Sequence, residues 1–246
     1  MSRLFYVVLI GLLPACEQNA HVSYFPLSPG QIWQYDITLK PGYEVEEHMV
    51  SIRRSLTPVT LTQRERETWQ SAPLEITYEN ITPIQHENDT LYYYRHNEEG
   101  TQRIAFQASG GSIVRFDMPQ RIVLHEPLTP GHAWDVPSQT FLLVRRLPSD
   151  MDMRATVPFA MRYTIDATDV TLRLHGQRYD NVLRVQGEGK TSFLGERGIG
   201  TIDVLITETN WYAPNVGLVK MERTETTSSQ LFGKNMYTME LTSHQP

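Results

Sequence analysis

Apolar and polar side chains alternate with a period of two along much of the chain. In residues 31–40, Trp33, Tyr35, Ile37 and Leu39 fall on one side, and polar residues fall on the other. Such alternation is typical of a β-strand with one buried face. The same pattern predicts further strands at residues 74–80, 90–96, 102–107, 113–118, 141–146, 162–166, 170–175, 182–187, 199–207, 218–224 and 236–241.

Turn-forming pairs such as Pro41-Gly42 and Asn88-Asp89 separate these segments. No long window shows the 3.6-residue period of a helix, and the best helix candidate, residues 62–69, is short and highly charged. Many short strands at close spacing predict an all-β fold: an antiparallel, strongly curved sheet that forms an open barrel or a sandwich.

An eight-residue segment occurs twice. Residues 26–33 (PLSPGQIW) and 127–134 (PLTPGHAW) share Pro, Leu, Pro, Gly and Trp, and they pair Ser with Thr. Each copy places a Pro-Gly turn before a Trp that begins a strand. We therefore expect a duplicated β unit, with residues 24–120 as the first repeat and 121–246 as the second, either separate or in one continuous domain. Trp33 and Trp134 should then be buried in equivalent places.

The N-terminus has the pattern of an export signal. Arg3 precedes an apolar run at residues 4–13, which is shorter than the about 20 residues that span a bilayer. The run ends in Leu-Pro-Ala-Cys at residues 13–16, and Cys16 is the only cysteine of the chain. An ordinary secretory signal with an incidental cysteine is the alternative interpretation.

Residues 13–16 resemble the lipobox of bacterial lipoproteins. The resemblance implies that residues 1–15 are a cleaved signal peptide, that Cys16 is acylated, and that residues 16–23 are a lipidated tether to the bilayer. Glu17 follows the cysteine in place of the Asp that favours inner-membrane retention in well-studied lipoproteins. The resemblance therefore implies a lipid-anchored protein of the outer membrane that faces the periplasm.

Charge and composition exclude several classes of protein. The chain carries 22 Lys and Arg against 28 Asp and Glu, a net charge of −6, which argues against a nucleic-acid partner. Its 40% apolar content is too high for a disordered chain. A single cysteine excludes an intramolecular disulfide.

Three short blocks resemble a family of uncharacterised bacterial outer-membrane lipoproteins. They are Tyr-Phe-Pro-Leu at residues 24–27 with Gly30, Trp33 and Tyr35; Tyr-Asp-Asn-Val-Leu-Arg-Val at 179–185; and Trp-Tyr-Ala-Pro-Asn-Val-Gly-Leu-Val-Lys at 211–220. The family has no assigned reaction, so the resemblance implies no activity. Physically, residues 213–217 predict a tight hairpin turn in which Gly217 adopts a positive φ.

Candidate catalytic and metal-binding motifs are weak. Residues 187–191 (GEGKT) lack the spacing of a phosphate-binding loop and are better explained as a β-turn. The pairs His125 with His132 and His86 with His96 could each meet across a hairpin, but neither has a third ligand at a fixed spacing, which favours surface histidines. The carboxylates of Glu44, Glu46 and Glu47 suggest either glycosidase chemistry or, preferably, a charged sheet edge. We predict no catalytic residue, no metal and no cofactor.

Aromatic residues provide the candidate interaction surface. Tyr92-Tyr93-Tyr94 places aromatic rings on both faces of one strand, which suits either a stacking platform or a core with its rim. The candidate interaction surface therefore consists of Tyr92 and Tyr94 from this strand and Trp211 and Tyr212 from the block at residues 211–220.

Three functions remain open at this point. The leading hypothesis is a non-enzymatic, membrane-anchored module that acts in envelope assembly through an unidentified envelope protein, bound at a strand edge or aromatic patch. The alternative is a carrier of lipid or another apolar ligand, and the third is an envelope hydrolase or its inhibitor. A solid core with an exposed edge favours the first, an enclosed apolar cavity the second, and converging carboxylates or histidines the third.

Overall fold

The computed structural model describes residues 22–42, 46–65, 74–86, 88–146, 152–195 and 200–246, so Cys16 and the signal segment lie outside the described residues. The strands are β1 (Ile32–Lys40), β2 (Glu47–Ser55), β3 (Val59–Glu65), β4 (Leu74–His86), β5 (Leu91–Asn97), β6 (Gly100–Gln107), β7 (Arg115–His125), β8 (Ala133–Gln139), β9 (Val144–Arg146), β10 (Asp152–Arg154), β11 (Pro158–Leu174), β12 (Gln177–Leu194), β13 (Thr201–Ala213), β14 (Gly217–Thr227) and β15 (Lys234–Gln245). These described segments contain no helix, and hence none of a length and apolarity that would cross a membrane.

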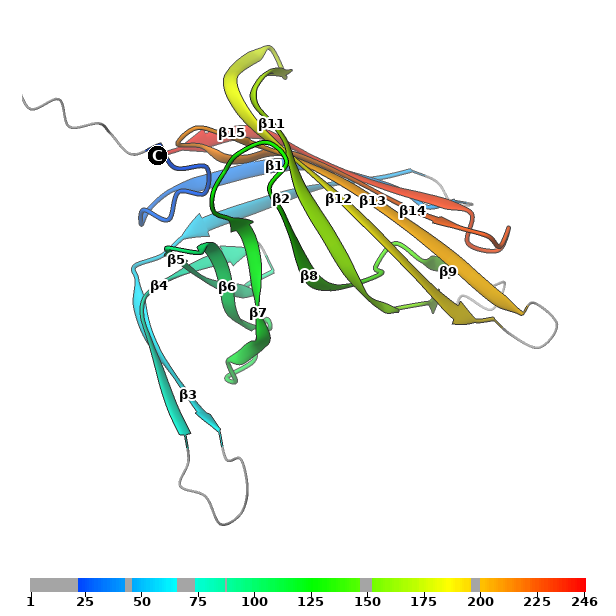
Figure 1. Cartoon of the computed structure of the whole chain (residues 1–246), viewed down its shortest axis with the longest axis horizontal. Coiled ribbons are helices and arrows are strands. Elements are labelled where there is room, and N and C mark those ends of the chain that lie inside the picture. Colours follow the sequence, from blue (N-terminus) through cyan, green and yellow to red (C-terminus); the bar gives the residue numbers. More distant parts are fainter. Residues whose placement is uncertain (1–21, 43–45, 66–73, 87, 147–151, 196–199) are drawn as a thin grey trace, which may run out of the picture.

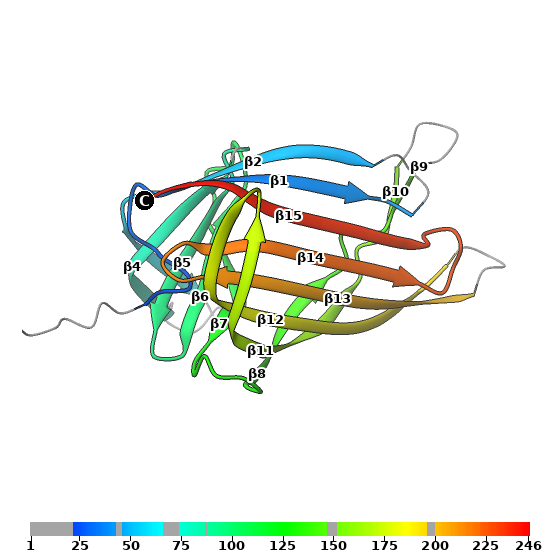
Figure 2. The same cartoon turned by 90° about the horizontal axis from the view of Figure 1, so that it is seen from above.

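Thirteen strands form one antiparallel sheet in the order β7-β6-β5-β4-β2-β1-β15-β14-β13-β12-β11-β8, with β3 paired to β4 beside this path. The sheet curls into a nearly closed barrel (Figures 1 and 2). Its two end strands, β7 and β8, face each other without forming a ladder, and we call this gap the seam. β9 and β10 form a separate two-stranded sheet, and β3 with the start of β4 extends away from the barrel (Figure 1). The predicted all-β, antiparallel, strongly curved fold is confirmed.

The chain follows a similar path twice. One meander runs through β1, β2, β4, β5, β6 and β7, and a second runs through β8 and β11 to β15. The last strand of the second meander pairs with the first strand of the first, through β15 and β1, whereas the other junction is the seam. The predicted boundary after residue 120 lies inside β7, so it does not separate the two meanders.

The two copies of the Pro-Gly-Trp segment adopt the same local geometry. Gly30 and Gly131 have φ angles of 91° and 87°, and their amides donate to the carbonyl oxygens of Ser55 and Ile165 at 3.0 and 2.8 Å. The tryptophans that follow are both buried. Their surroundings differ, however: Trp33 packs in one core cluster and donates its indole N–H to Val216, whereas Trp134 packs in another cluster and its indole nitrogen has no hydrogen-bond partner. The shared turn agrees with a duplicated unit, the differing surroundings do not, and a common origin of the two halves stays a prediction.

Local patterns misled two sequence interpretations. The helix predicted for residues 62–69 is wrong over residues 62–65. These residues belong to β3, which pairs with β4 from Val59 to Glu65. Residues 66–69 lie outside the described residues. Residues 187–191 are not a turn but the middle of β12. Gly187 is required there because a Cβ atom would lie 2.6 Å from the ring of Tyr163.

Candidate ligand-binding cavity

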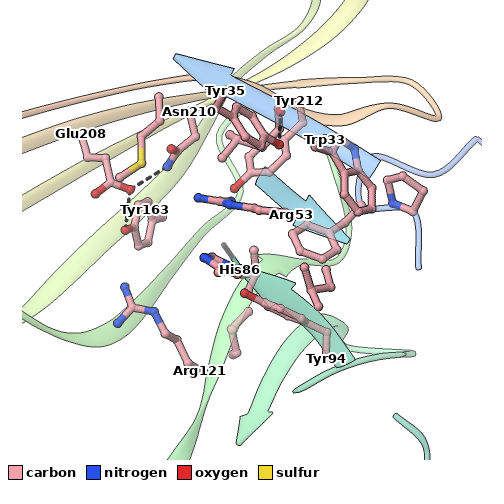
Figure 3. Close-up of a pocket in the computed structure, with 18 residues that line it drawn as sticks. Trp33, Tyr35, Arg53, His86, Tyr94, Arg121, Tyr163, Glu208, Asn210 and Tyr212 are labelled. Atoms are coloured by element: carbon pink, nitrogen blue, oxygen red, sulfur yellow. Dashed lines mark hydrogen bonds between the residues drawn. The ribbon is translucent and has the colours of Figure 1, made fainter. Parts of the chain in front are cut away.

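A cavity of about 230 Å³ lies within the barrel (Figure 3). Its walls come from the segment before β1 and from β1, β2, β4, β5, β7, β11, β13 and β14. Because antiparallel strands present alternate side chains to one face, each of these strands contributes inward-facing residues. The apolar part of the lining includes Phe25, Trp33, Ile84, Ile122, Leu218 and Met221.

Four tyrosines line the polar part of the cavity wall, namely Tyr35, Tyr94, Tyr163 and Tyr212 (Figure 3). Burial raises the pKa of Tyr35 to about 12 and also raises the pKa of Tyr94 and Tyr212. The tyrosine hydroxyls therefore stay protonated near neutral pH and act as hydrogen-bond donors. The hydroxyl of Tyr35 donates to the carbonyl oxygen of Leu218 at 2.9 Å.

Two arginines point into the same space. Arg53 comes from β2, opposite Trp33 of β1, and its guanidinium carbon lies 4.8 Å from the centre of the Tyr35 ring. Arg121 comes from β7, and its Nη1 donates across the seam to the carbonyl oxygen of Pro137 at 3.3 Å. Positive charge thus enters the cavity from two sides (Figure 3).

His86 lies between these charges and the aromatic wall. Burial lowers the pKa of His86 to about 3, and the positive charges of Arg53 and Arg103 contribute to that lowering. The ring packs edge-on against Tyr92, with centroids 4.7 Å apart. His86 is therefore neutral at physiological pH.

A buried ion-pair network holds Glu208, the carboxylate that lines the cavity within the described part of the chain. Glu208 accepts hydrogen bonds from the Tyr163 hydroxyl at 2.9 Å, from the Asn210 amide at 2.7 Å and from Arg223 at 3.2 Å. Arg223 also pairs with the fully buried Glu225 at 2.8 Å. The Glu208 carboxylate is thus held in place by three buried donors.

The three sequence blocks that suggested the lipoprotein family meet at one end of the cavity. The indole nitrogen of Trp33 donates to the Val216 carbonyl oxygen at 2.7 Å, and the Tyr24 hydroxyl donates to the Asn181 carbonyl oxygen at 2.9 Å. Pro26 packs so closely on Gly217 that a Cβ atom there would lie 3.2 Å from the proline ring. The N-terminal block is thereby fixed against the hairpin of β13 and β14.

The predicted hairpin is confirmed in detail. β13 and β14 pair antiparallel with Ala213 opposite Gly217, and Gly217 has a φ of 94°. Val219 is fully buried, and Leu218 and Trp211 pack partly buried against the same core cluster.

The four residues nominated as an interaction surface do not form one exposed patch. Tyr94 and Tyr212 line the cavity, and Tyr212 is buried, which removes it from any outer surface. Tyr92 lies beside the cavity against His86. Trp211 lies next to Tyr212 in β13 and therefore faces the other side of the sheet, where the Lys220 ammonium lies 5.5 Å from its ring centre.

The two histidine pairs have different outcomes. His125 and His132 meet across the seam, with Nδ1 of one 2.7 Å from Nε2 of the other, and both rings stack near Trp134. His86 and His96 lie at opposite ends of the β4 and β5 pairing. Among the described residues, no group of three or more His, Cys, Asp or Glu side chains could hold a metal ion.

The sequence pattern did not identify Arg53, Arg121 or His86 as residues of a ligand cavity. Arg53 and Arg54 are neighbours in β2, and period-two alternation shows that they face opposite sides but not which one faces inward. The alternation of residues along β2 is visible in the sequence. Only the direction in which the sheet curves shows that Arg53, and not Arg54, faces the barrel interior.

Comparison with known proteins shows no family for this chain. The sequence matches no protein-family model and no curated protein. Among solved structures, a candidate lipoprotein from Parabacteroides distasonis ATCC 8503 is similar over 91% of this chain and 99% of its own, with 12% sequence identity and a TM-score of 0.34. Similarity at this level carries no information about function.

Proposed function

We propose that this protein is a lipid-anchored protein of the bacterial cell envelope whose barrel binds an apolar small molecule. The observation that carries the proposal is the cavity of about 230 Å³, bounded by aromatic and aliphatic side chains inside the barrel. Small-molecule sites are concave and mostly apolar, with a few convergent polar groups, and this cavity has that composition. A cavity with a largely apolar lining supports the carrier alternative over a purely protein-binding module.

Membrane attachment in this proposal rests on the sequence. Cys16 is the only cysteine and ends a segment that resembles a lipobox. Several acyl chains on one residue would anchor the protein firmly, because each buried methylene contributes roughly 0.8 kcal/mol. Outer-membrane placement, a periplasm-facing barrel and a non-catalytic role belong to the same proposal.

A cavity-filling substitution tests ligand binding. Met221 lines the cavity from β14, and Met221→Trp places a larger side chain in it. We expect this variant to lose most of the affinity for an environment-sensitive apolar dye that the wild-type protein binds. Glu222→Trp is the matched control, because Glu222 is the exposed neighbour on the opposite face of β14. Equal dye binding by both variants, or no binding by the wild-type protein, would contradict the proposal.

A second candidate function is retained because of one strand edge. β2 pairs with β4 only from Arg53 to Ser55, whereas it pairs with β1 along most of its length. Met49 and Val50, in the part of β2 before that contact, are 43% and 48% exposed. Such an edge suits the addition of a strand from a protein partner, the interaction module that the sequence suggested first. Glu47 at the start of β2 is the kind of charged edge residue that limits unspecific pairing.

A further inference from the structure

Arg53 lies in the cavity without a counter-ion among the described residues. Its Nη2 lies 3.1 Å from the Met239 sulfur, a weak acceptor, and its Nε is buried with no hydrogen-bond partner. None of the ion pairs in the described part of the chain involves Arg53. A guanidinium with a buried, unpaired donor costs free energy, and such a group in a native structure calls for an explanation. An anionic ligand that enters the cavity would supply the missing counter-ion to the guanidinium group.

The groups around Arg53 are also donors. Arg121 adds a second positive charge to the lining, and within the described part of the chain the hydroxyls of Tyr94 and Tyr212 make no hydrogen bond. Burial raises the pKa of both tyrosines, so their hydroxyls keep their protons. The carboxylate of Glu208 is already engaged by its three partners. Free donors therefore exceed free acceptors among the described cavity residues, and the ligand should bring the acceptors.

We infer that the cavity selects an amphiphile with an oxyanion head, a carboxylate or a phosphate, which binds to Arg53 while its apolar body packs against the aromatic wall. The inference rests on the proposed function and specifies the ligand's polar end. The cavity of about 230 Å³ has room for a short aliphatic chain beside the head group. A chain of about eight carbons serves as the apolar body of the test ligands.

The test compares three ligands that share an octyl-length chain: octanoate, octyl phosphate and octan-1-ol. It uses residues 16–246 with Cys16→Ser, the mature chain that the lipobox resemblance implies, so that neither an acyl chain nor the apolar run at residues 4–13 competes for the cavity. Affinities come from displacement of the apolar dye described above. We expect at least one of the two acids to bind at least about tenfold more tightly than the alcohol, because a charge-assisted hydrogen bond contributes about 1.5–3 kcal/mol. The acid that binds more tightly identifies the head group.

Two substitutions localise the effect. Arg53→Met should weaken binding of the preferred acid by about tenfold or more and leave octan-1-ol within about twofold, which also shows that the variant is folded. Arg54→Met is the matched control, because Arg54 is exposed on the opposite face of β2, and it should change neither affinity.

The outcomes separate this inference from the proposed function. Equal affinities for the alcohol and both acids, or equal effects of Arg53→Met and Arg54→Met, would overturn the oxyanion head and leave apolar binding intact. Failure of the wild-type protein to bind the dye and all three ligands would overturn both.

Discussion

His86 occupies a position where protonation and folding are coupled. The ring lies beside Tyr92 and lines the cavity together with Arg53, while the charge of Arg103 also acts on it. Burial and these two positive charges lower its pKa from the usual 6.5 to about 3. The folded protein therefore holds a neutral imidazole over a pH range in which the unfolded chain is protonated.

This difference predicts a stability that falls in acid. The unfolded chain binds a proton near pH 6.5 and the folded protein only near pH 3, so the free energy of unfolding should decrease as the pH falls between these values. One proton limits the slope to about 1.4 kcal/mol per pH unit. His86→Gln should reduce the slope in denaturant titrations at several pH values. The exposed His48→Gln is the control, and an equal slope in wild-type protein and His86→Gln would refute the coupling.

A second residue-scale prediction concerns the buried ion-pair network. The side chain of Arg223 is 2% exposed, and its partners Glu208 and Glu225 are 5% and 0% exposed. Arg223→Met leaves two buried carboxylates without their cation and should cost about 3–5 kcal/mol of unfolding free energy. Arg162→Met, which removes an exposed pair with Asp135, should cost about 0–1 kcal/mol in the same denaturation experiment. Similar costs for both variants would disprove the stabilising role of the network.

At the scale of elements, the β13 and β14 hairpin connects the cavity with the N-terminal segment. Its turn contains Asn215, whose backbone amide donates to the Ser23 carbonyl oxygen at 2.7 Å, and Gly217, on which Pro26 packs. The hairpin therefore fixes the entry of the chain into β1 as well as one end of the cavity.

Gly217→Val should destabilise this hairpin for two reasons. A β-branched residue is strained at a φ of 94°, which costs about 1–3 kcal/mol, and its Cβ would meet the Pro26 ring at 3.2 Å. Gly176→Val measures the backbone strain alone, because Gly176 has a φ of 82° and a Cβ atom there would have no neighbouring atom within 4 Å. Thermal melts should show the larger loss for Gly217→Val. An unchanged melting temperature would instead assign the motif to partner binding.

Strands were predicted well from the sequence where one face of the strand is buried and the other is exposed to solvent. The alternation in residues 31–40 and the turn before Gly217 are examples of signals carried by adjacent residues. The pairing of β1 with β15 brings together strands from the two ends of the chain, and no local pattern encodes it. The same limit applies to the site: Tyr94 and Tyr212 were nominated for an interaction surface and not for a cavity, and Arg53 became a site residue only through the curvature of the sheet.

At the scale of the whole molecule, the barrel and the expected anchor are close together in sequence. Residues 16–23 reach at most about 28 Å when extended, so an acylated Cys16 would hold the barrel near the membrane surface. The N-terminal segment then runs directly to the cavity, because Phe25 and Pro26 line it. A ligand that leaves or enters a membrane would have a short distance to travel.

The anchor itself is tested by fractionation. Cys16→Ser removes the thiol that acylation requires, so the variant should leave the membrane fraction, and its intact mass should lack the acyl groups. Ser23→Ala, a substitution in the same segment that keeps Cys16, serves as the control and should stay in the membrane fraction. Retention of Cys16→Ser in the membrane at an unchanged mass would exclude the lipoprotein.

The central claim, that the barrel interior is a ligand site, is tested most directly by methionine-methyl NMR of residues 16–246 with Cys16→Ser. Met221 lines the cavity, whereas Met49 and Met236 are 43% and 39% exposed and do not line it. Titration with octan-1-ol should shift the Met221 methyl signal in a saturable way and leave the Met49 and Met236 signals in place. Shifts confined to the exposed methionines, or no saturable shift at Met221, would contradict a ligand site inside the barrel.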